Sequence, residues 1–293
     1  MPDSTVFATR YADLNDTPAP FREAMAAALE AGERLQILIH SPGFTALSRR
    51  SPASLLAVTE KRWLLALETP RRGIFVAASA FADTLLVELD SVLLYGRFKI
   101  DYTDAAGRQQ AAAIEFNTVN KAYYFDALWR ILNGTEERSA IDADAAPPPD
   151  DWPFKMRNRY RDYLPPGQSL LGGVYWPAVS GGFHREIAPA AALLLTQREL
   201  ILLSDEPAPR WRLGKPQTRY GIIASYVPLS RCAGFYTSEK EARGHIATLT
   251  VRLHGAHGGE EMHAAFEPSR RARIEALIRQ ALPELVEERV ATT

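Results

Sequence analysis

Three histidines fall within ten residues of one another near the C-terminal end of the chain, at His254, His257 and His263. Imidazole nitrogens bind transition metals, and Glu260 or Glu261 could add a carboxylate ligand. A hairpin here could bring His254 and His263 across from each other. The spacing matches no known metal-ligand signature, so a solvated hairpin is favoured over the site of a metal-dependent hydrolase.

Basic side chains form small groups in several predicted loops, and one group includes a tryptophan. Such groups attract anionic partners, and each charge gains about 1 kcal/mol near an anionic membrane surface. Taken singly, each group also fits an ordinary solvated loop, because protein surfaces are commonly a quarter or more charged. The candidate binding residues are Arg49, Arg50, Arg71, Arg72, Arg210, Trp211, Arg212, Lys215 and Arg219.

Nucleophilic and phosphate-binding chemistry find little support in the sequence. We find no Gly-x-Ser-x-Gly elbow, no P-loop and no Gly-x-Gly-x-x-Gly fingerprint. The single cysteine, Cys232, excludes an intrachain disulfide and a Cys-rich zinc site, and a buried structural role is favoured for it. We therefore expect no cofactor and no enzymatic activity.

The composition is that of a globular protein with about two domains. Of 293 residues, 46% are hydrophobic and 24% are charged, and 34 basic residues nearly cancel 35 acidic ones. The net charge of -1 argues against a nucleic-acid-binding protein, which usually carries a basic excess. Neither a secretory signal nor an apolar run of about 18 residues is found, so we expect a cytoplasmic protein, with peripheral membrane attachment left open.

The elements that must position these residues occur twice in the chain. The strongest similarity is between Pro52–Glu68 and Pro189–Asp205, at an offset of 137 residues. Three weaker pairs occur in the same order, with offsets of 135, 140 and 150: Gly32–Pro42 with Gly167–Pro177, Leu86–Leu89 with Tyr226–Leu229, and Ile114–Asn117 with Ala264–Glu267. Because surface loops absorb insertions cheaply, a growing offset indicates a duplicated domain with longer loops in its second copy.

Each copy is predicted to contain six or seven antiparallel strands followed by one amphipathic helix. In the first copy the helix is capped by Asn117 and stops at Asn133-Gly134, and in the second copy it begins at Pro268-Ser269. Runs of aliphatic and β-branched residues between turn signals predict the strands of the first copy. These strands are Leu35–His40, Leu55–Val58, Arg62–Glu68, Ile74–Ala77, Leu85–Leu89, Leu93–Ile100 and Ala112–Phe116.

Each copy resembles a pleckstrin-homology-like (PH-like) domain of the GRAM or bacterial PH type. Two features carry the resemblance. One is the strand–turn–strand segment at Leu55–Glu68 and Leu193–Asp205, and the other is the late strand with a phenylalanine before the last helix. The resemblance covers roughly residues 32–133 and 167–283 and implies two tandem bent β-barrels, each closed by its C-terminal amphipathic helix. The predicted parts are a helical lead-in (1–31), domain 1 (32–141), an acidic proline-rich linker (142–152) and domain 2 with its leading helix (153–293).

The resemblance implies a non-catalytic binding or scaffold protein that engages a protein partner. PH-like domains often bind peptides along an exposed strand or groove, and addition of a strand to a sheet edge is physically available. The same exposed barrel edges allow a homo-oligomer. Two alternatives stay open: a peripheral membrane protein that binds anionic lipid headgroups through the basic loops, and, less favoured, a metal-dependent hydrolase.

Overall fold

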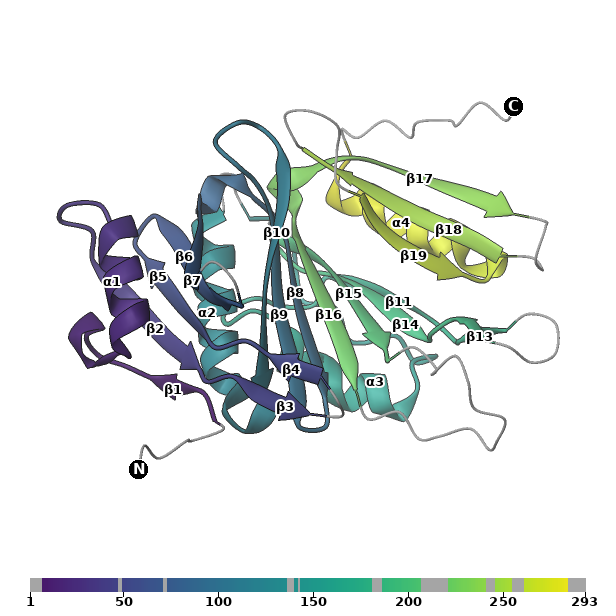
Figure 1. The fold of residues 1–293 in the computed structure, drawn as a ribbon. Coiled ribbons are helices and arrows are strands. Elements are labelled where there is room, and N and C mark those ends of the chain that lie inside the picture. Colours follow the sequence, from purple (N-terminus) through teal and green to yellow (C-terminus); the bar gives the residue numbers. More distant parts are fainter. Residues whose placement is uncertain are drawn as a thin grey trace. The chain divides into compact units, whose positions relative to one another are not determined.

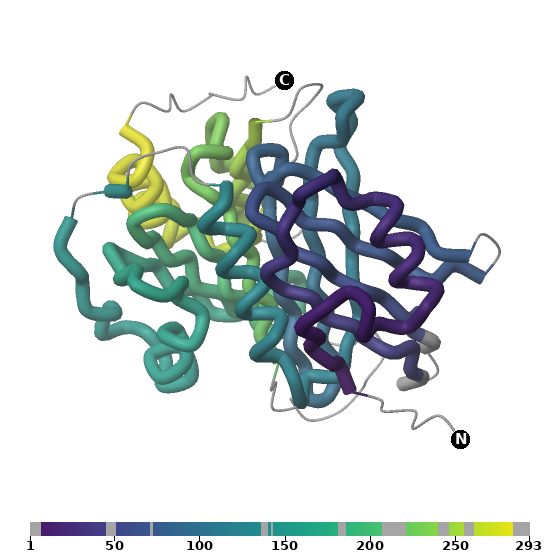
Figure 2. The backbone as a smooth tube through the Cα atoms, turned by 90° about the vertical axis from the view of Figure 1, so that its left-hand side faces the viewer, coloured from purple at the N-terminus to yellow at the C-terminus, as the bar shows by residue number. Residues whose placement is uncertain are grey.

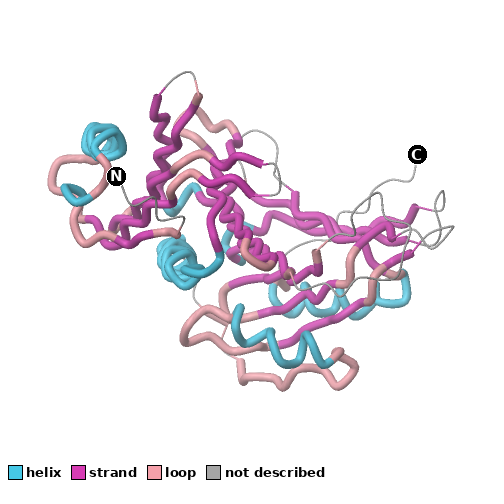
Figure 3. Tube along the Cα trace, turned by 60° about the horizontal axis from the view of Figure 1, so that its bottom comes forward, coloured by secondary structure: helices cyan, strands magenta, loops and turns pink. Residues whose placement is uncertain are grey.

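The structure is a computed structural model, and it describes residues 7–46, 49–70, 73–135, 140–141, 143–180, 186–206, 221–240, 246–254 and 261–283. The chain divides into two compact units, Met1–Glu136 (unit 1) and Glu137–Thr293 (unit 2). Antiparallel strands dominate both units, and the described residues include four α-helices (Figures 1 and 3). A mainly β architecture with added helices, as predicted from the sequence, is confirmed.

Unit 1 contains ten strands and two helices among its described residues. In chain order they are β1 (Thr9–Arg10), α1 (Ala19–Ala28), β2 (Leu35–Ser41), β3 (Phe44–Ala46), β4 (Arg49–Ser51), β5 (Ser54–Thr59), β6 (Arg62–Thr69), β7 (Gly73–Ala80), β8 (Thr84–Val92), β9 (Tyr95–Thr103), β10 (Gln109–Asn117) and α2 (Lys121–Thr135). One sheet has the order β1-β2-β5-β6-β7, and β8, β9 and β10 pair antiparallel in succession. β3 and β4 form a separate hairpin.

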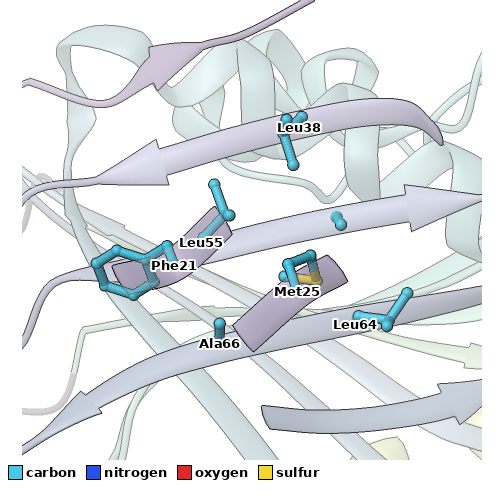
Figure 4. Packing of buried hydrophobic residues seen from close by; sticks show 7 residues of the cluster. Phe21, Met25, Leu38, Leu55, Leu64 and Ala66 are labelled. Atoms are coloured by element: carbon cyan, nitrogen blue, oxygen red, sulfur yellow. The ribbon is translucent and has the colours of Figure 1, made fainter. Parts of the chain in front are cut away.

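Both faces of the β5–β6 pair are covered, which explains their uninterrupted apolar sequences. On one face, Phe21 and Met25 of α1 pack against Leu38, Leu55 and Leu64 (Figure 4). Figure 2 shows α1 in front of these strands. The opposite face of β5 and β6 contacts α2. Strands buried on both faces show continuous hydrophobic runs instead of alternation.

The helix α2 is anchored by an aromatic pair at the end of β10. The ring of Tyr124 stacks on Phe116, with centroids 3.7 Å apart. Leu128, Ile131 and Leu132 follow on the same buried stripe of the helix. The predicted helix stripe is therefore confirmed, but α2 continues through Gly134 to Thr135, so the predicted stop at Asn133-Gly134 falls inside the helix.

Unit 2 contains a similar set of elements. In chain order they are α3 (Phe154–Arg159), β11 (Gly172–Trp176), β12 (Val179–Ser180), β13 (Glu186–Ala188), β14 (Ala191–Leu195), β15 (Glu199–Asp205), β16 (Ile222–Pro228), β17 (Cys232–Lys240), β18 (Ile246–Leu253), β19 (Glu261–Phe266) and α4 (Arg271–Ala281). β11, β14, β15 and β16 pair in that order, and β17, β18 and β19 form a three-stranded sheet. β12 and β13 form a separate hairpin. The helix α4 packs against β11 and β14.

The two units share one succession of elements. In each, a leading helix precedes four paired strands, then three further strands, then a C-terminal helix. A small hairpin follows the first of the four paired strands in both units, and a 3-10 turn precedes both the first of the three further strands and the C-terminal helix. The most similar segments of the two copies occupy matched places, because Leu55–Glu68 lies in β5 and β6 while Leu193–Asp205 lies in β14 and β15.

The proline-rich segment before α3 is held against unit 2. The Ala146 N–H donates to the Leu170 carbonyl at 2.7 Å, and the Trp152 side chain is buried. The Asp151 carboxylate accepts hydrogen bonds from Arg273 at 2.6 Å and Arg270 at 2.9 Å, which hold its pKa below the usual range. The part of the predicted linker that the structure describes is thus attached to unit 2 by these contacts, and the boundary between the two units lies between Glu136 and Glu137.

Candidate functional site

The turn between β8 and β9 consists of two exposed leucines. Leu93 and Leu94 are 70% and 65% exposed, among the highest values for large apolar side chains in the described residues. Two-residue hairpin turns favour Asn-Gly or Asp-Gly, because these residues adopt the required backbone angles at low cost. The sequence predicts a strand from Leu93 to Ile100, whereas in the structure β9 begins at Tyr95, so the two leucines fall in the turn. This correction places them in solvent.

Leu93 adopts a left-handed backbone conformation, with a φ of 53°. It is the one non-glycine residue with positive φ among the residues that the structure describes. For an L-residue with a bulky side chain this conformation costs roughly 1–2 kcal/mol. A strained residue of this kind suggests a functional constraint, because the fold could relieve the strain with asparagine or glycine.

Thr118, just before α2, satisfies both carbonyls of the turn. Its hydroxyl donates to the Leu93 carbonyl, and its N–H donates to the Leu94 carbonyl at 3.2 Å. The next residue, Val119, is 59% exposed. We call Leu93, Leu94 and Val119 the apolar tip. In Figure 1 it lies at the lower end of unit 1, where β8 turns into β9 and α2 begins.

The N-terminal part of the chain reaches the same place. The Asn120 side chain donates to the Ala8 carbonyl at 2.7 Å, which fixes β1 beside the beginning of α2. Phe7, the residue before Ala8, is itself exposed. A fourth large apolar side chain is thereby brought to the end of unit 1 that carries the tip.

A polar cluster fixes the base of the hairpin. The Tyr95 hydroxyl donates to the Glu115 carboxylate at 2.9 Å, and the Ser51 hydroxyl donates to the other carboxylate oxygen. Burial, together with this hydrogen bond to a carboxylate, raises the pKa of Tyr95 to about 12. The phenol therefore stays a neutral donor throughout the physiological range. It ties the first residue of β9 to β10, beside the turn that carries the tip.

This arrangement favours desolvation of the tip on binding. The exposed side chains are apolar, and the carbonyls beneath them are already hydrogen-bonded inside the protein. Covering the tip therefore gains hydrophobic free energy without stranding those two carbonyls, whose loss of water would otherwise cost energy. The geometry is that of a contact surface, with no nucleophile or acid–base pair among these groups.

No protein-family model matches this chain, and no curated protein matches its sequence. The evidence for the candidate site therefore comes from the geometry of unit 1 alone.

The predicted basic residues fall mostly outside the described residues. Arg49 and Arg50 form part of β4, opposite Ala46 and Thr45, and only their backbone is described. The remaining members of the set lie outside the described ranges: Arg71, Arg72, Arg210, Trp211, Arg212, Lys215 and Arg219. Their role in binding stays a prediction. Among the described residues, none of the helices combines the length and apolarity that crossing a bilayer requires.

The histidine hairpin differs from its expected geometry. In the β18–β19 pairing His263 lies opposite Thr250, and its Nδ1 is 3.1 Å from the Thr250 hydroxyl. His254 follows the end of β18, four residues beyond Thr250, so it does not lie across from His263. His257 is outside the described residues, and within the described ranges no three potential ligands converge on a metal site. Cys232 is buried at the start of β17, as expected.

We expect the substitution Leu93→Asn to raise the free energy of unfolding by about 1 kcal/mol, because asparagine tolerates positive φ far better than leucine. Urea unfolding followed by circular dichroism measures the change. Leu94→Asn is the matched control, since it removes the same apolar group at a turn residue without positive φ, and it should bring no gain. A lower stability for Leu93→Asn than for Leu94→Asn would show that Leu93 is not strained.

Proposed function

We propose that the protein is a non-catalytic binding or scaffold protein that engages a protein partner through the apolar tip of unit 1, on a framework of two PH-like domains. The shared succession of four strands, three strands and a C-terminal helix supports the PH-like framework. In unit 1 the Ser41 hydroxyl of β2 also donates to the Glu115 carbonyl of β10 at 3.2 Å. This side-chain contact links the first and last long strands of unit 1, which supports the proposed PH-like framework.

The observation that carries the proposal is the strained and exposed Leu93 beside Leu94. Folding gains nothing from leucine at a positive φ in solvent, whereas burying a leucine side chain in a complex gains about 1.5–3 kcal/mol. Exposed apolar groups that stand together mark binding surfaces more often than isolated ones do. A partner with an apolar pocket would take the tip as its central contact, surrounded by polar rim contacts.

The test is affinity purification of the full-length protein from its native cells, in three versions. The wild type and Phe154→Asn should recover the same stoichiometric partner, since Phe154 is also a highly exposed apolar residue but belongs to unit 2. Leu93→Asn should lose that partner while folding at least as stably as the wild type. Recovery of the same partner by all three proteins would contradict a role for the tip.

The lipid alternative is distinguished by vesicle sedimentation. A compact leucine tip also suits shallow insertion into a bilayer, and the predicted basic loops would favour anionic headgroups. If lipid were the ligand, the wild type would sediment with vesicles containing phosphatidylglycerol and Leu93→Asn would not. For a protein-binding tip, we expect no sedimentation with either phosphatidylcholine or phosphatidylglycerol vesicles.

A further inference from the structure

We propose that β7 pairs antiparallel with β7 of a second copy of the chain, so that two copies form a two-fold dimer through this sheet edge. This inference goes beyond the proposed function and does not depend on it. The apolar tip and β7 belong to different strands, so each can be altered without the other.

β7 is a long and regular sheet edge. It pairs with β6 over eight consecutive residues, from Thr69 opposite Gly73 to Arg62 opposite Ala80, and this register is unbroken. Among the described strands, β7 comes last in the order β1-β2-β5-β6-β7. Backbone N–H and C=O groups along such an edge are a template for another strand.

β7 lacks the features by which sheet edges usually prevent pairing. Its sequence, Gly-Ile-Phe-Val-Ala-Ala-Ser-Ala, contains no charge and no proline, and its pairing with β6 has no bulge. The other long outer strands differ. β10 begins with two glutamines and contains Glu115, and β19 contains Glu261 and His263. Since β7 is uncharged, two copies of it can pair without bringing like charges together.

The order of side-chain sizes in β7 favours a second copy as the partner. The first half carries large side chains at Ile74, Phe75 and Val76, and the second half, Ala77–Ala80, carries only small ones. An antiparallel pair around a two-fold axis brings the first half of each strand opposite the second half of the other. Residues directly opposite share one face of the sheet, so Phe75 of one copy would lie opposite Ala77 or Ser79 of the other. With Phe75 opposite Ser79, the axis passes through Ala77 and every large side chain of the first half meets a small one. With Phe75 opposite Ala77, the two Val76 side chains meet each other on the axis.

The exposure of β7 fits this pairing. Ile74 and Val76 face α1, where they pack against the cluster around Phe21 and Met25. Phe75 points to the other face and is 56% exposed, in register with Leu67 of β6. Pairing would extend the sheet across the two-fold axis and cover Phe75. An isologous contact of this kind closes after two copies, so it yields a discrete dimer.

The first test is disulfide trapping. The one native cysteine, Cys232, is buried, so a cysteine introduced into β7 reports its own contacts. Single variants with cysteine at positions 75, 76, 77 and 78 are oxidised mildly. A two-fold axis through the strand should give one position that cross-links strongly, because only the residue on the axis lies opposite itself, within disulfide range. Phe154→Cys is the exposed control and should stay monomeric on a non-reducing gel.

The second test is the association state of the full chain, measured by sedimentation equilibrium across a concentration series. We expect a wild-type dimer, and for Ala78→Lys an association weaker by about tenfold or more, because lysine on an edge strand blocks pairing. Ala78 is exposed, so circular dichroism should show an unchanged fold, and Phe154→Lys should dimerise like the wild type. A monomeric wild type, a dimer insensitive to Ala78→Lys, equal cross-linking at all four positions, or open-ended aggregates would each overturn the proposal.

Discussion

Replacing Gly134 by alanine should lower the free energy of unfolding by about 2–3 kcal/mol, even though alanine is the better helix former by about 1 kcal/mol. Gly134 lies in the last turn of α2, and a β-carbon there would overlap the ring of Phe81. Phe81 is buried in the 3-10 turn between β7 and β8, so its ring cannot move into solvent. Overpacking of a filled core therefore outweighs the gain in helix propensity.

Urea unfolding of the full chain, followed by circular dichroism, measures this loss. Asn133→Ala is the matched control, because Asn133 is an exposed neighbour in the same helix and its replacement should change stability by less than about 0.5 kcal/mol. The double variant Gly134→Ala with Phe81→Leu should be less destabilised than the two single effects added together, since the smaller side chain makes room. A neutral or stabilising Gly134→Ala would show that the Phe81 ring yields to the added β-carbon, so that helix propensity outweighs the overlap.

Glu33→Gln should lower the free energy of unfolding by about 2 kcal/mol at pH 7, and the difference should fade as the pH falls. The Glu33 carboxylate accepts hydrogen bonds from Nε of Arg62 at 2.8 Å and from its Nη2 at 2.6 Å, and it also accepts the Glu30 N–H. Arg62 in turn donates to the Ala28 carbonyl, so this pair joins the end of α1 to β6. Glutamine keeps the shape but removes the charge that faces the guanidinium.

The pH dependence follows from the pKa of Glu33. Its hydrogen bonds with Arg62 are the main cause that lowers this pKa from 4.5 to about 2. A lowered folded-state pKa means that the stabilisation is complete above about pH 4.5 and is lost as the pH falls through about 2. Urea unfolding at a series of pH values from 7 to 2.5 should show the wild type approaching Glu33→Gln over this window.

Glu60→Gln is the control for this experiment. Glu60 pairs with Arg34, whose side chain is 81% exposed, and exposed ion pairs contribute at most about 1 kcal/mol. In the sequence repeat, the residue of unit 2 that corresponds to Glu33 is a glutamine, Gln168. Its side chain donates to the Glu199 carboxylate at 3.0 Å. A stability difference between wild type and Glu33→Gln that stays constant with pH would show that the carboxylate charge is unimportant.

The sequence predicted the strands that are buried on both faces more fully than the elements that meet solvent. The segments Leu55–Val58 and Arg62–Glu68 are recognisable because a short apolar run between turn signals is typical of a strand that is buried on both faces. The same preference for long apolar runs assigned Leu93 to a strand, although it lies in the turn. Apolar residues are expected in strands, and the residue type of the two leucines does not by itself show that they are exposed.

The candidate site shows a similar division. The basic groups and the histidines were visible in the sequence because charged and imidazole side chains stand out by type. The apolar tip was missed, since its members belong to a hairpin and to the segment before α2, and the contacts of Thr118 bring them together. The one signal that could have found it is the absence of turn-forming residues between two strands whose pairing requires a tight turn.

The sequence by itself determined the repeated order of strands and final helix and the burial of the central strands, because local apolar patterns and turn residues decide these features. The tertiary structure alone decided which apolar side chains remain in solvent, which strand is left at a sheet edge, and why Gly134 must be a glycine. Each of these depends on what lies opposite a residue in space, such as Phe81 opposite Gly134, and residues far apart in the chain supply those neighbours.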